Sequence, residues 1–484
     1  MTDRVTDVVP DRVDLLVVGG GFVGSVVSMI ARRLGLSVAM VDRDVHPRFA
    51  IGESSTPAGN MVLASLGARY DLPVLSQMAR YGTWKDAFPE LGVGAKRGFS
   101  YFHHEPGIRW RQHPEHDTEL LVAASDHPLN CDTHWYRPEV DAFLFREAGR
   151  MGASLFEGVE IDQLVRPDSW VATLSDGRRL ASAVLLDATG GGGFASRFLQ
   201  AGTGPPLRTQ TRAAFAHFAG LPTWQSTSAL DPGDYPFPAD HAALHHVTPQ
   251  GWMWQLRFDN DVTSVGIVTP VAAGARPECV DPDAWIGAFP GIAEQFRSAT
   301  LTAPRAGWVR TGNLQRRCRV AGGLGWALLP HAAGFVDPLH STGIAHSLAG
   351  IERLALLLEK GDEDFGEYGE GVLTEIDHID GLVSLCYQAS GRVEAFNDAT
   401  MLYFAASIQY ERARMAQGAD FRGAFLGADD PEMARAFTGA AARLGHSDAA
   451  FREGVKAAIE PWNDAGLLAP EVSNMYRHTA PRGW

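Results

Sequence analysis

Three closely spaced glycines, Gly19, Gly21 and Gly24, lie between an apolar run and an Ala-, Val- and Met-rich stretch. The run Asp14–Val18 predicts a buried strand, and the stretch that follows has helical spacing as far as Leu34. In such a turn the first glycine allows tight bending, the second lets backbone approach a pyrophosphate, and the third lets helix and strand pack closely. The helix start then offers free N–H groups and a positive dipole end to phosphates. The spacing therefore predicts a dinucleotide site.

An acidic residue follows at the distance that this chemistry requires. Ser37–Val41 predicts a second strand, and Asp42 ends it, 18 residues after Gly24. A carboxylate at that point can accept a hydrogen bond from a ribose hydroxyl. A glycine-rich turn without a ligand is the alternative, but the ordered succession of strand, glycines, helix, strand and acid favours the dinucleotide. The pattern alone does not separate NAD from FAD.

Further elements must position these residues. The stretch Asp132–Gly152 is predicted to be a helix with a proline near its start, where proline does least harm. The runs Trp170–Leu174 and Leu180–Leu186 flank Ser-Asp-Gly and predict a hairpin. Residues 344–415 hold long helix-compatible stretches, and the tail that ends at Trp484 is predicted to be polar and rich in loops.

The composition narrows the class of protein. The chain has 484 residues, 45% hydrophobic and 20% charged, which is ordinary for a folded globular protein. Its formal net charge of −15 disfavours nucleic acid and anionic membrane surfaces, because both need basic patches. We expect no secretion signal and no membrane-spanning run, and hence a cytoplasmic protein. The four cysteines, which we expect to be reduced and mostly buried, are Cys131, Cys279, Cys318 and Cys386.

Four later segments carry a more specific pattern: Gly52–Pro57, Gly251–Trp254, Ala333–Gly343 and Asp187–Gly190. With the glycine turn, they resemble the flavin-dependent halogenases, which belong to the FAD-binding monooxygenase-type folds. The first segment is similar to the family's Gly-Glu-Ser loop beside the flavin, and the second to its Trp-x-Trp-x-Ile-Pro signature. The third is similar to the family's stretch beside the isoalloxazine, and the fourth to the motif that closes around FAD. The matches run in the family's order from residue 14 to about 350.

The resemblance implies an α/β fold: a Rossmann-like FAD-binding domain, an inserted antiparallel β-sheet domain on the substrate side, and a C-terminal helical region. The FAD-binding domain is expected to be discontinuous, over residues 14–204 and 306–350. Residues 205–305, with frequent prolines and alternating strands, are expected to form the substrate-side sheet, which residues 97–130 can join. Residues 351–484 form the expected helical region.

The resemblance assigns FAD contacts to the glycine turn and to the later motifs. These residues are Gly19, Gly21, Gly24, Asp42, Glu53, Ser54, Asp187, Gly190, His331, Asp337 and Gly343. His331 departs from the family, which carries Gly-Asp where this chain has Pro330-His331. Because the usual Asp contacts the ribityl chain, this flavin contact is expected to be altered.

A turn of small residues, Ser341-Thr342-Gly343, precedes a predicted helix. Backbone N–H groups at such a turn form a cup for an anion. In the halogenases the Thr and Gly positions hold the halide, so the resemblance assigns chloride or bromide to Thr342 and Gly343. A side-chain N-cap by Ser341 or Thr342 is the alternative, and both readings can hold because they use the same geometry.

Trp252 and Trp254 share one face of a predicted strand, because side chains alternate along a strand. Two indoles on one face form either a plug in the core or the wall of an aromatic pocket. The resemblance assigns them to the boundary between flavin and substrate. Leu256 and Arg257 stand where the family has Ile and Pro, and the arginine is the larger departure.

A lysine between flavin and substrate delivers halogen from hypohalous acid in this family. Lys96, which precedes Gly98 and an aromatic run, resembles that lysine in its sequence context, and Lys85 is the rival. Burial at the start of an apolar strand would lower the pKa of Lys96 and sharpen its nucleophilicity. His340 could orient hypohalous acid or accept the proton lost from the ring, and a packed histidine is the equal alternative.

No metal site is predicted. The pairs His103-His104 and His245-His246 lack a third ligand at a recognisable spacing. They are expected to be histidines of loops and strand ends.

The sequence thus predicts a two-component halogenase. Reduced FAD from a separate flavin reductase, dioxygen and chloride or bromide would halogenate an electron-rich phenol, pyrrole or indole. A second glycine motif for NAD(P)H is not seen, which favours imported reduced flavin. A monooxygenase or dehydrogenase on the same scaffold and a catalytically silent FAD-binding protein stay open as alternatives. So do a free or carrier-tethered substrate and a homodimer.

Overall fold

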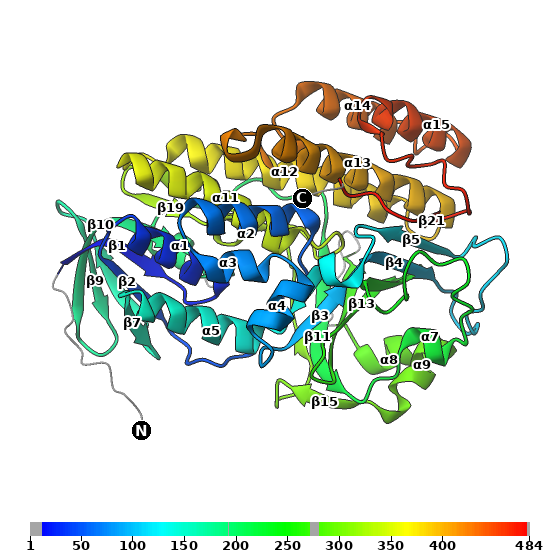
Figure 1. Cartoon of the computed structure of the whole chain (residues 1–484), viewed down its shortest axis with the longest axis horizontal. Helices are drawn as coiled ribbons and strands as arrows, with labels where there is room; N and C mark the ends of the chain where they lie inside the picture. The colour runs from blue at the N-terminus through cyan, green and yellow to red at the C-terminus, as the bar shows by residue number, and fades with distance from the viewer. Residues whose placement is uncertain (1–11, 192, 272–279, 482–484) are drawn as a thin grey trace.

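Two β-sheets lie side by side under a layer of long helices in the computed structural model of the protein (Figure 1). The structure describes residues 12–191, 193–271 and 280–481, so Cys279 lies outside the described residues. One sheet has eight strands and carries the glycine turn, and the other has nine. The chemistry predicted from the sequence falls between them.

The first sheet has the order β18-β19-β10-β1-β2-β7, in which the strands from β19 to β7 pair in parallel and β18 pairs antiparallel with β19. The hairpin β8–β9 is added beside β10. Its strands are β1 (Arg12–Val18), β2 (Val38–Asp42), β7 (Ser154–Glu157), β8 (Ile161–Val165), β9 (Trp170–Leu174), β10 (Arg179–Asp187), β18 (Gly322–Gly323) and β19 (Trp326–Leu328). Leu15, Leu16 and Val17 of the central strand β1 are fully buried. A parallel strand covered on both faces needs such a continuous apolar run. The first two predicted strands and the predicted hairpin are confirmed.

Helix α1 (Phe22–Arg33) covers this sheet and packs against α5 (Arg137–Arg150) and α11 (Thr342–Lys360). Gly24 permits the close contact between α1 and β1, because a Cβ at this position would lie 1.9 Å from the carbonyl oxygen of Gly19. Any side chain there would push the helix off the strand. The glycine spacing therefore has the packing role that the sequence predicts.

The predicted helix over residues 132–152 is wrong at its start. Asp132–Trp135 form strand β6, which pairs with β3 (Val93–Lys96), and α5 begins only at Arg137. Four residues carry little periodic signal, and pairing with a distant segment decides their conformation. The correction matters because the pairing places Asp132 directly opposite Lys96.

The second sheet has the order β15-β11-β14-β13-β12-β4-β5-β21, with β16 beside β11. Its strands are β4 (Gly98–His103), β5 (Glu119–Ala123), β11 (Thr211–Ala219), β12 (Ala243–Thr248), β13 (Gly251–Arg257), β14 (Val262–Pro270), β15 (Thr300–Ala303), β16 (Val309–Arg310) and β21 (Met475–Tyr476). The sheet is not purely antiparallel as predicted, because β12 pairs with β4 and β5 with β21 in parallel. Those pairs join segments that are far apart in the chain and that no hairpin connects.

Shorter helices and strands complete the two halves. They are α2 (Pro57–Arg69), α3 (Pro73–Met78), α4 (Tyr81–Ala87), α6 (Phe194–Phe198), α7 (Trp224–Thr227), α8 (Pro282–Gly287), α9 (Pro290–Gln295), α10 (Pro330–Ala333), β17 (Arg316–Arg317) and β20 (Gly334–Phe335). In Figure 1, α7, α8 and α9 lie beneath the second sheet, on the side away from the long helices. The apolar side chains of Trp224, Phe289 and Ile292 belong to the same buried cluster as Met253 and Ile267 of that sheet.

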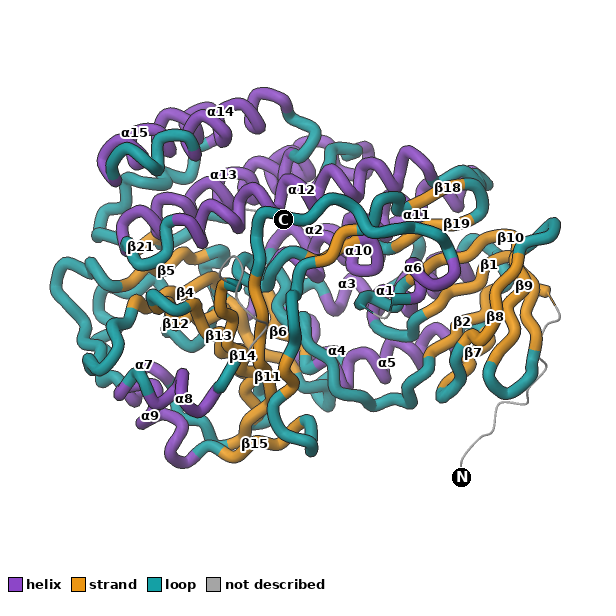
Figure 2. Tube along the Cα trace, turned by 180° about the vertical axis from the view of Figure 1, so that it is seen from behind, coloured by secondary structure: helices purple, strands orange, loops and turns teal. Residues whose placement is uncertain are grey.

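The long helices α11, α12 (Gly366–Gln388) and α13 (Val393–Gln417) span both sheets, as the view from behind shows (Figure 2). Two further helices, α14 (Pro431–Ala441) and α15 (Asp448–Ile459), form an outer layer above α13 (Figure 1). The predicted loop-rich tail is therefore wrong. The side chains of Asp430 and Ser447 cap these two helices by accepting backbone hydrogen bonds, and this start signal is present in the sequence.

Glu375 ties the layer of long helices together from a fully buried position on α12. It pairs with Arg353 of α11 at 2.5 and 2.6 Å, with His346 at 3.0 Å, and it accepts the backbone N–H of Phe425 at 2.6 Å. Burial would raise the pKa of Glu375, but the Arg353 guanidinium and His346 lower it to about 2. The carboxylate thus fixes α11, whose first turn faces the candidate site.

We expect Glu375→Gln to lower the free energy of unfolding at neutral pH by about 3 kcal/mol, because it leaves the half-buried Arg353 without its buried counter-ion. The folded pKa is depressed, so the stabilisation is present above the unfolded pKa of about 4.3 and is lost as the pH falls toward 2. Urea unfolding of both proteins between pH 7 and pH 4 measures the difference. A difference in unfolding free energy between the two proteins that increases as the pH falls would contradict this account.

The described residues were also compared with the predictions on membrane spans and on cysteines. Among the described residues, no helix combines the length and apolar character needed to cross a membrane. Cys131, Cys318 and Cys386 are free thiols, and two of them, Cys131 and Cys386, are buried.

Candidate functional site

A cavity of about 480 Å³ lies between the glycine turn, the second sheet and the start of α11. Eight of the predicted site residues line it: Gly21, Glu53, Ser54, Gly190, Trp254, His331, Asp337 and Gly343. A second cavity of about 370 Å³ shares Arg48 and Thr189 with the first, and Gly19 and Asp42 line it. Gly24, Asp187, Thr342, Trp252, Lys96 and His340 are not among the residues that line either cavity.

The glycine turn packs its backbone closely against the residues that follow β10. Gly19 has a φ of +105°, and a Cβ there would lie 2.6 Å from the carbonyl oxygen of Ala188. The backbone N–H of Gly20 donates to Asp42 Oδ2 at 2.7 Å, which holds the acid at the end of β2 beside the turn. The predicted turn and its acid therefore meet at the second cavity.

Arg48, Arg137 and Asp141 complete this end of the site and were missed in the sequence analysis. Arg137 holds Asp141 with two hydrogen bonds of 2.7 and 2.8 Å, and Asp141 accepts the first backbone N–H of α1 at 3.2 Å. Arg137 also donates to the carbonyl of Gly52 at 3.0 Å. Arg48 lies 3.5 Å from Asp42 and 3.6 Å from Asp141. The i, i+4 spacing of Arg137 and Asp141 was the available signal.

Asp187 acts on the cavity through the turn that follows it. Its Oδ1 accepts the N–H and the hydroxyl of Thr189 at 2.8 and 2.7 Å. Burial raises its pKa to about 6, against these hydrogen bonds. Gly190, next in the turn, has a φ of +63° and lines the first cavity.

The opposite end of the first cavity carries Asp337 and His331. Asp337 accepts hydrogen bonds from the hydroxyls of Thr211 at 2.9 Å and Tyr387 at 3.0 Å, and burial raises its pKa to about 7. His331 hydrogen-bonds with Ser347 Oγ at 2.7 Å, and burial lowers its pKa to about 3, so the ring is neutral at pH 7. Asp337 is therefore already engaged, whereas His331 keeps one ring nitrogen outside that contact.

The turn predicted to bind an anion lies at the N-terminus of α11. Ser341 has a φ of +53° and makes no side-chain capping hydrogen bond, so the predicted alternative of a Ser341 side-chain cap is wrong. The first N–H groups of a helix have no partner within the helix, so they stay available to a ligand. Ser341 and Gly343 line the cavity, and a Cβ at Gly343 would lie 2.9 Å from the His331 ring.

The two tryptophans lie on the same side of β13, but only Trp254 forms the cavity wall. Trp252 packs behind it at 6.0 Å between ring centroids and donates to Tyr387 at 2.7 Å. Gly266 on the neighbouring strand makes room for the Trp254 indole, since a Cβ there would lie 2.0 Å from it. Leu256 also lines the cavity. Trp254 therefore forms part of the cavity wall, and Trp252 supports it from behind.

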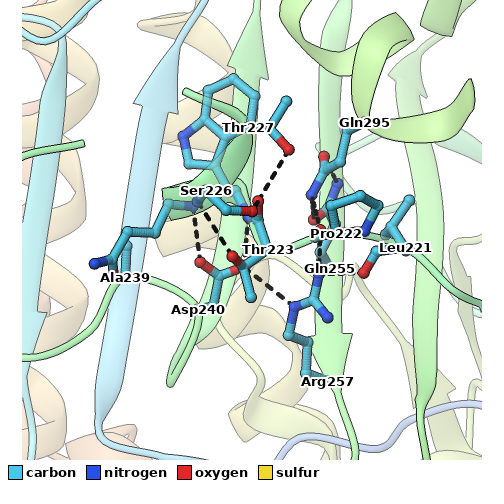
Figure 3. A network of polar contacts seen from close by, with 12 residues as sticks. Leu221, Pro222, Thr223, Ser226, Thr227, Ala239, Asp240, Gln255, Arg257 and Gln295 are labelled. Atoms are coloured by element: carbon cyan, nitrogen blue, oxygen red, sulfur yellow. Dashed lines mark hydrogen bonds and ion pairs between the residues drawn. The ribbon is translucent and has the colours of Figure 1, made fainter. Parts of the chain in front are cut away.

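Arg257, the departure from the halogenase signature, leaves the cavity and holds two loops (Figure 3). Its guanidinium donates to the carbonyls of Leu221 and Pro222 and lies 3.2 Å from Asp240. Asp240 in turn accepts the backbone N–H groups of Trp224 and Gln225. The figure also shows Gln255 and Gln295, which join their side-chain amides at 2.8 Å.

The loop that Arg257 holds supports the strand pair that carries Lys96. The carbonyl of His241, next to Asp240, accepts the N–H of Arg97 at 2.6 Å. The carbonyl of Ala239 accepts the Ser100 hydroxyl at 2.9 Å. The arginine therefore acts on the candidate lysine through one loop.

Lys96 is fully buried at the end of β3, directly before β4. Its Nζ donates to the carbonyl of Ser55 at 2.5 Å and lies 4.0 Å from the Phe99 ring centroid. Burial lowers the pKa of Lys96 to about 7, against the opposing charges of Asp132 and Glu411. Lys85 instead pairs with Asp259 at 2.6 Å with 28% of its side chain exposed.

His340 and His245 lie on the far side of the same aromatic cluster. His340 stacks on Tyr403 at 4.3 Å, and burial lowers its pKa to about 3. Its Nδ1 is buried without a hydrogen-bond partner. His245 was expected at a strand end, but it lies inside β12, lines the cavity and stacks on Tyr101 at 4.5 Å. No cluster of three or more metal-ligating side chains occurs in the described part of the chain.

The fold and the glycine turn beside the cavities are those of a dinucleotide-binding protein, and the start of α11 lines the first cavity. Comparison with known proteins agrees: the family model for tryptophan halogenases matches residues 112–425, more than half of the chain. The chain therefore belongs to the tryptophan halogenase family and is a flavin-dependent halogenase.

Two curated relatives show how far this likeness extends. The chain is 28% identical over 396 residues to the monodechloroaminopyrrolnitrin halogenase PrnC of Pseudomonas fluorescens, covering 78% of this chain and 68% of that protein. It is 26% identical over 439 residues to the tetracycline 7-halogenase of Kitasatospora aureofaciens, covering 84% and 76%.

Solved structures share the fold. Halogenase PltM, solved in complex with phloroglucinol and FAD, matches with a TM-score of 0.84 at 22% identity, over 97% of this chain and 100% of that one. The flavin-dependent brominase Bmp2 matches with a TM-score of 0.57 at 21% identity, over 77% and 86%. The first of these follows the present chain through both sheets and the helical layer.

We expect Arg257→Ala to lower the free energy of unfolding by about 2 kcal/mol, because it leaves the buried Asp240 without its cation. Arg69→Ala, which breaks a more exposed ion pair with Glu359, is the matched control and should cost less than about 1 kcal/mol. Urea unfolding at pH 7 compares the two. Equal losses of unfolding free energy in the two variants would show that the Arg257 network stabilises the protein no more than an exposed ion pair does.

Proposed function

We propose that this halogenase transfers chlorine or bromine to an electron-rich aromatic ring, a phenol, pyrrole or indole, with Lys96 delivering the halogen. One observation carries the proposal. The buried amine of Lys96 donates to the carbonyl of Ser55, and the two residues before it, Glu53 and Ser54, line the cavity. The amine is thus one hydrogen bond behind the wall of the flavin-side cavity.

The cavity residues fit FAD. The close backbone approach at Gly19, the acid Asp42 beside it and the two arginines Arg48 and Arg137 suit the ribose and the pyrophosphate. Gly190, His331 and Asp337 lie where the isoalloxazine end would be held, with Glu53 and Ser54 opposite. When bound, reduced FAD supplies the two electrons that, with dioxygen, convert a halide ion into hypohalous acid.

The start of α11 supplies the halide site. Thr342 and Gly343 present backbone N–H groups in its first turn, and the positive end of the helix dipole favours an anion. The His331 ring next to Gly343 is neutral at pH 7. The halide is therefore proposed to be held by the backbone N–H groups and the helix dipole, with Arg316 lining the same cavity.

The substrate ring is proposed to lie in the aromatic cluster between Lys96 and His340. Phe99 contacts Lys96, Tyr403 stacks on His340, and Phe99 lies 6.1 Å from Tyr403. His340 is unprotonated at neutral pH and has a free Nδ1, so it can accept the proton that the ring loses. Trp252 lies 5.2 Å from His245, which lines the cavity and stacks on this cluster, so the tryptophan pair is proposed to limit direct oxygenation of the ring.

Partners are proposed on the same basis. A separate flavin reductase would supply reduced FAD. Among the relatives are a pyrrole chlorinase and a pyrrole brominase that act on substrates bound to a peptidyl-carrier protein. A tethered substrate is therefore proposed beside a free one. We also retain as proposals the cytoplasmic location, the homodimer and the division into FAD-binding residues 14–204 and 306–350, substrate-side residues 205–305 and a helical region.

The test supplies purified protein with FAD, a flavin reductase, NADH, dioxygen and bromide, and presents phenols, indoles and pyrroles. Mass spectrometry should find products with the bromine isotope doublet that require the protein and the halide. Hydroxylated or dehydrogenated products that form without halide would contradict the proposal and support flavin oxygenation or dehydrogenation instead.

We expect Lys96→Met to lower halogenation at least about a hundredfold, because methionine fills the space but cannot bind or transfer halogen. Flavin binding, followed by fluorescence quenching, should be unchanged. Lys85→Met is the matched control, since Lys85 forms a partly exposed ion pair, and it should keep full activity. If Lys85→Met loses halogenation and Lys96→Met keeps it, Lys85 and not Lys96 delivers the halogen.

A further inference from the structure

A buried group of three ionisable side chains surrounds the candidate reactive amine. Lys96 and Asp132 are directly opposite each other in the antiparallel pair β3–β6, so their side chains lie on one face of that pair. Glu411 reaches the same place from α13. All three side chains are buried.

Hydrogen bonds tie the Asp132 carboxylate and the Lys96 amine to the same residue, Ser55. Asn60 Nδ2 donates to Asp132 Oδ1 at 3.0 Å, the hydroxyl of Ser55 donates to Asn60 Oδ1, and the carbonyl of Ser55 accepts from Lys96 Nζ at 2.5 Å. Asp132 Oδ2 is buried with no hydrogen-bond partner. A buried carboxylate oxygen without a partner is costly unless it takes a proton, so this oxygen is ready to act as an acceptor.

The two histidines and the cysteine that face Lys96 do not change protonation near pH 7. Burial lowers the pKa of His134 and His245 to about 3, which leaves both neutral, and raises that of the Cys131 thiol to about 12. Burial raises the pKa of Asp132 to about 7 and that of Glu411 to about 8. Glu411 accepts the Ser407 hydroxyl at 3.0 Å and stays mainly protonated at pH 7, so one carboxylate balances one ammonium.

We propose that Asp132 is the proton-exchange partner of Lys96, taking its ammonium proton before halogen transfer and returning it during transfer. This inference rests on the proposed role of Lys96. Asp132 acts through the lysine and not on the substrate, and the exchange leaves the net charge of the buried group unchanged. A proton transfer without a change in net charge avoids the cost of creating a new charge in a buried site.

With this proton exchange, every proton is accounted for both when the halogen bonds to the lysine amine and when it passes to the substrate ring. The Lys96 ammonium gives a proton to the carboxylate of Asp132, the residue opposite it in the β3–β6 pair, and the amine lone pair then bonds the halogen of hypohalous acid. The oxygen–halogen bond breaks, and the leaving hydroxide takes an amine proton to form water. Asp132 next protonates the halogenated nitrogen, the ring's π electrons take the halogen, and the nitrogen–halogen bond breaks. The ring proton passes to His340 and restores the ammonium afterwards.

The chain is well suited to a direct test, because it has four lysines: Lys85, Lys96, Lys360 and Lys456. Labelling lysine with ¹³C at Cε lets NMR follow each amine titration separately, and Lys96→Met assigns the signal. In Asp132→Asn, which keeps the shape of the side chain, we expect the pKa of Lys96 to fall by about one pH unit or more. Glu411→Gln should change it less. An unchanged Lys96 titration in Asp132→Asn would overturn the proposal.

The pH profile of halogenation gives a second readout that a merely structural role would not move. In Asp132→Asn the acidic limb should shift to lower pH with the Lys96 titration, and the maximal rate should fall at least about tenfold. Asp132→Glu, which restores a carboxylate, should recover part of the rate. A shift of the basic limb instead would make the ammonium the reactive form and overturn the proposal.

The experiments also distinguish a failure of this inference from misfolding of a variant and from a failure of the proposed function. If Asp132→Asn does not fold, Asn60→Leu removes the hydrogen bond to Asp132 Oδ1 and should also lower the pKa of Lys96, whereas no change there would overturn the pairing. The NMR titration needs no turnover. A Lys96→Met variant that still halogenates would refute the proposed function, while the Asp132 titration would stand or fall by itself.

Discussion

Burial of the Lys96 amine is the constraint on which the arrangement of the site depends. A lysine taken out of water loses solvation and is kept only where polar groups replace the water. Here the Ser55 carbonyl, the Phe99 ring and the carboxyl groups of Asp132 and Glu411 do so. They come from four separate parts of the chain, so the amine is positioned only when these parts have assembled.

The surrounding structure can be understood as support for that assembly. The loop of residues 52–56 runs beside β6, with Ser55 N–H bonded to the Thr133 carbonyl at 3.0 Å, and it forms part of the cavity wall. Arg257 holds a loop that bonds the backbone after Lys96. Glu375 fixes α11, whose first turn faces the cavity. Arg257 and Glu375 are buried or half-buried charges with several partners, the class of interaction that is costly to break.

The fold was predictable where the signal is local and periodic. The strand at residues 14–18, the glycine turn, the hairpin and the long helices follow from apolar runs, glycine geometry and helical spacing. The strand at Asp132–Trp135 and the parallel pairs of the second sheet did not, because distant pairing decides them. The capped helices α14 and α15 were missed although Asp430 and Ser447 carried a readable start signal.

The same division applies to the site. By itself, the sequence determined a dinucleotide-binding glycine turn with Asp42, the small-residue turn at 341–343 before a helix and the short list of candidate lysines, because these depend on residue type and close spacing, and the family resemblance narrowed the dinucleotide to FAD. Only the tertiary structure decided that Lys96 is buried while Lys85 pairs at the surface, that Arg257 holds loops and does not face the cavity, and that Asp132 and Glu411 face the amine. The physical reason is that burial, charge balance and proton affinity come from neighbours that are remote in sequence, and only the folded chain brings them within reach of one another.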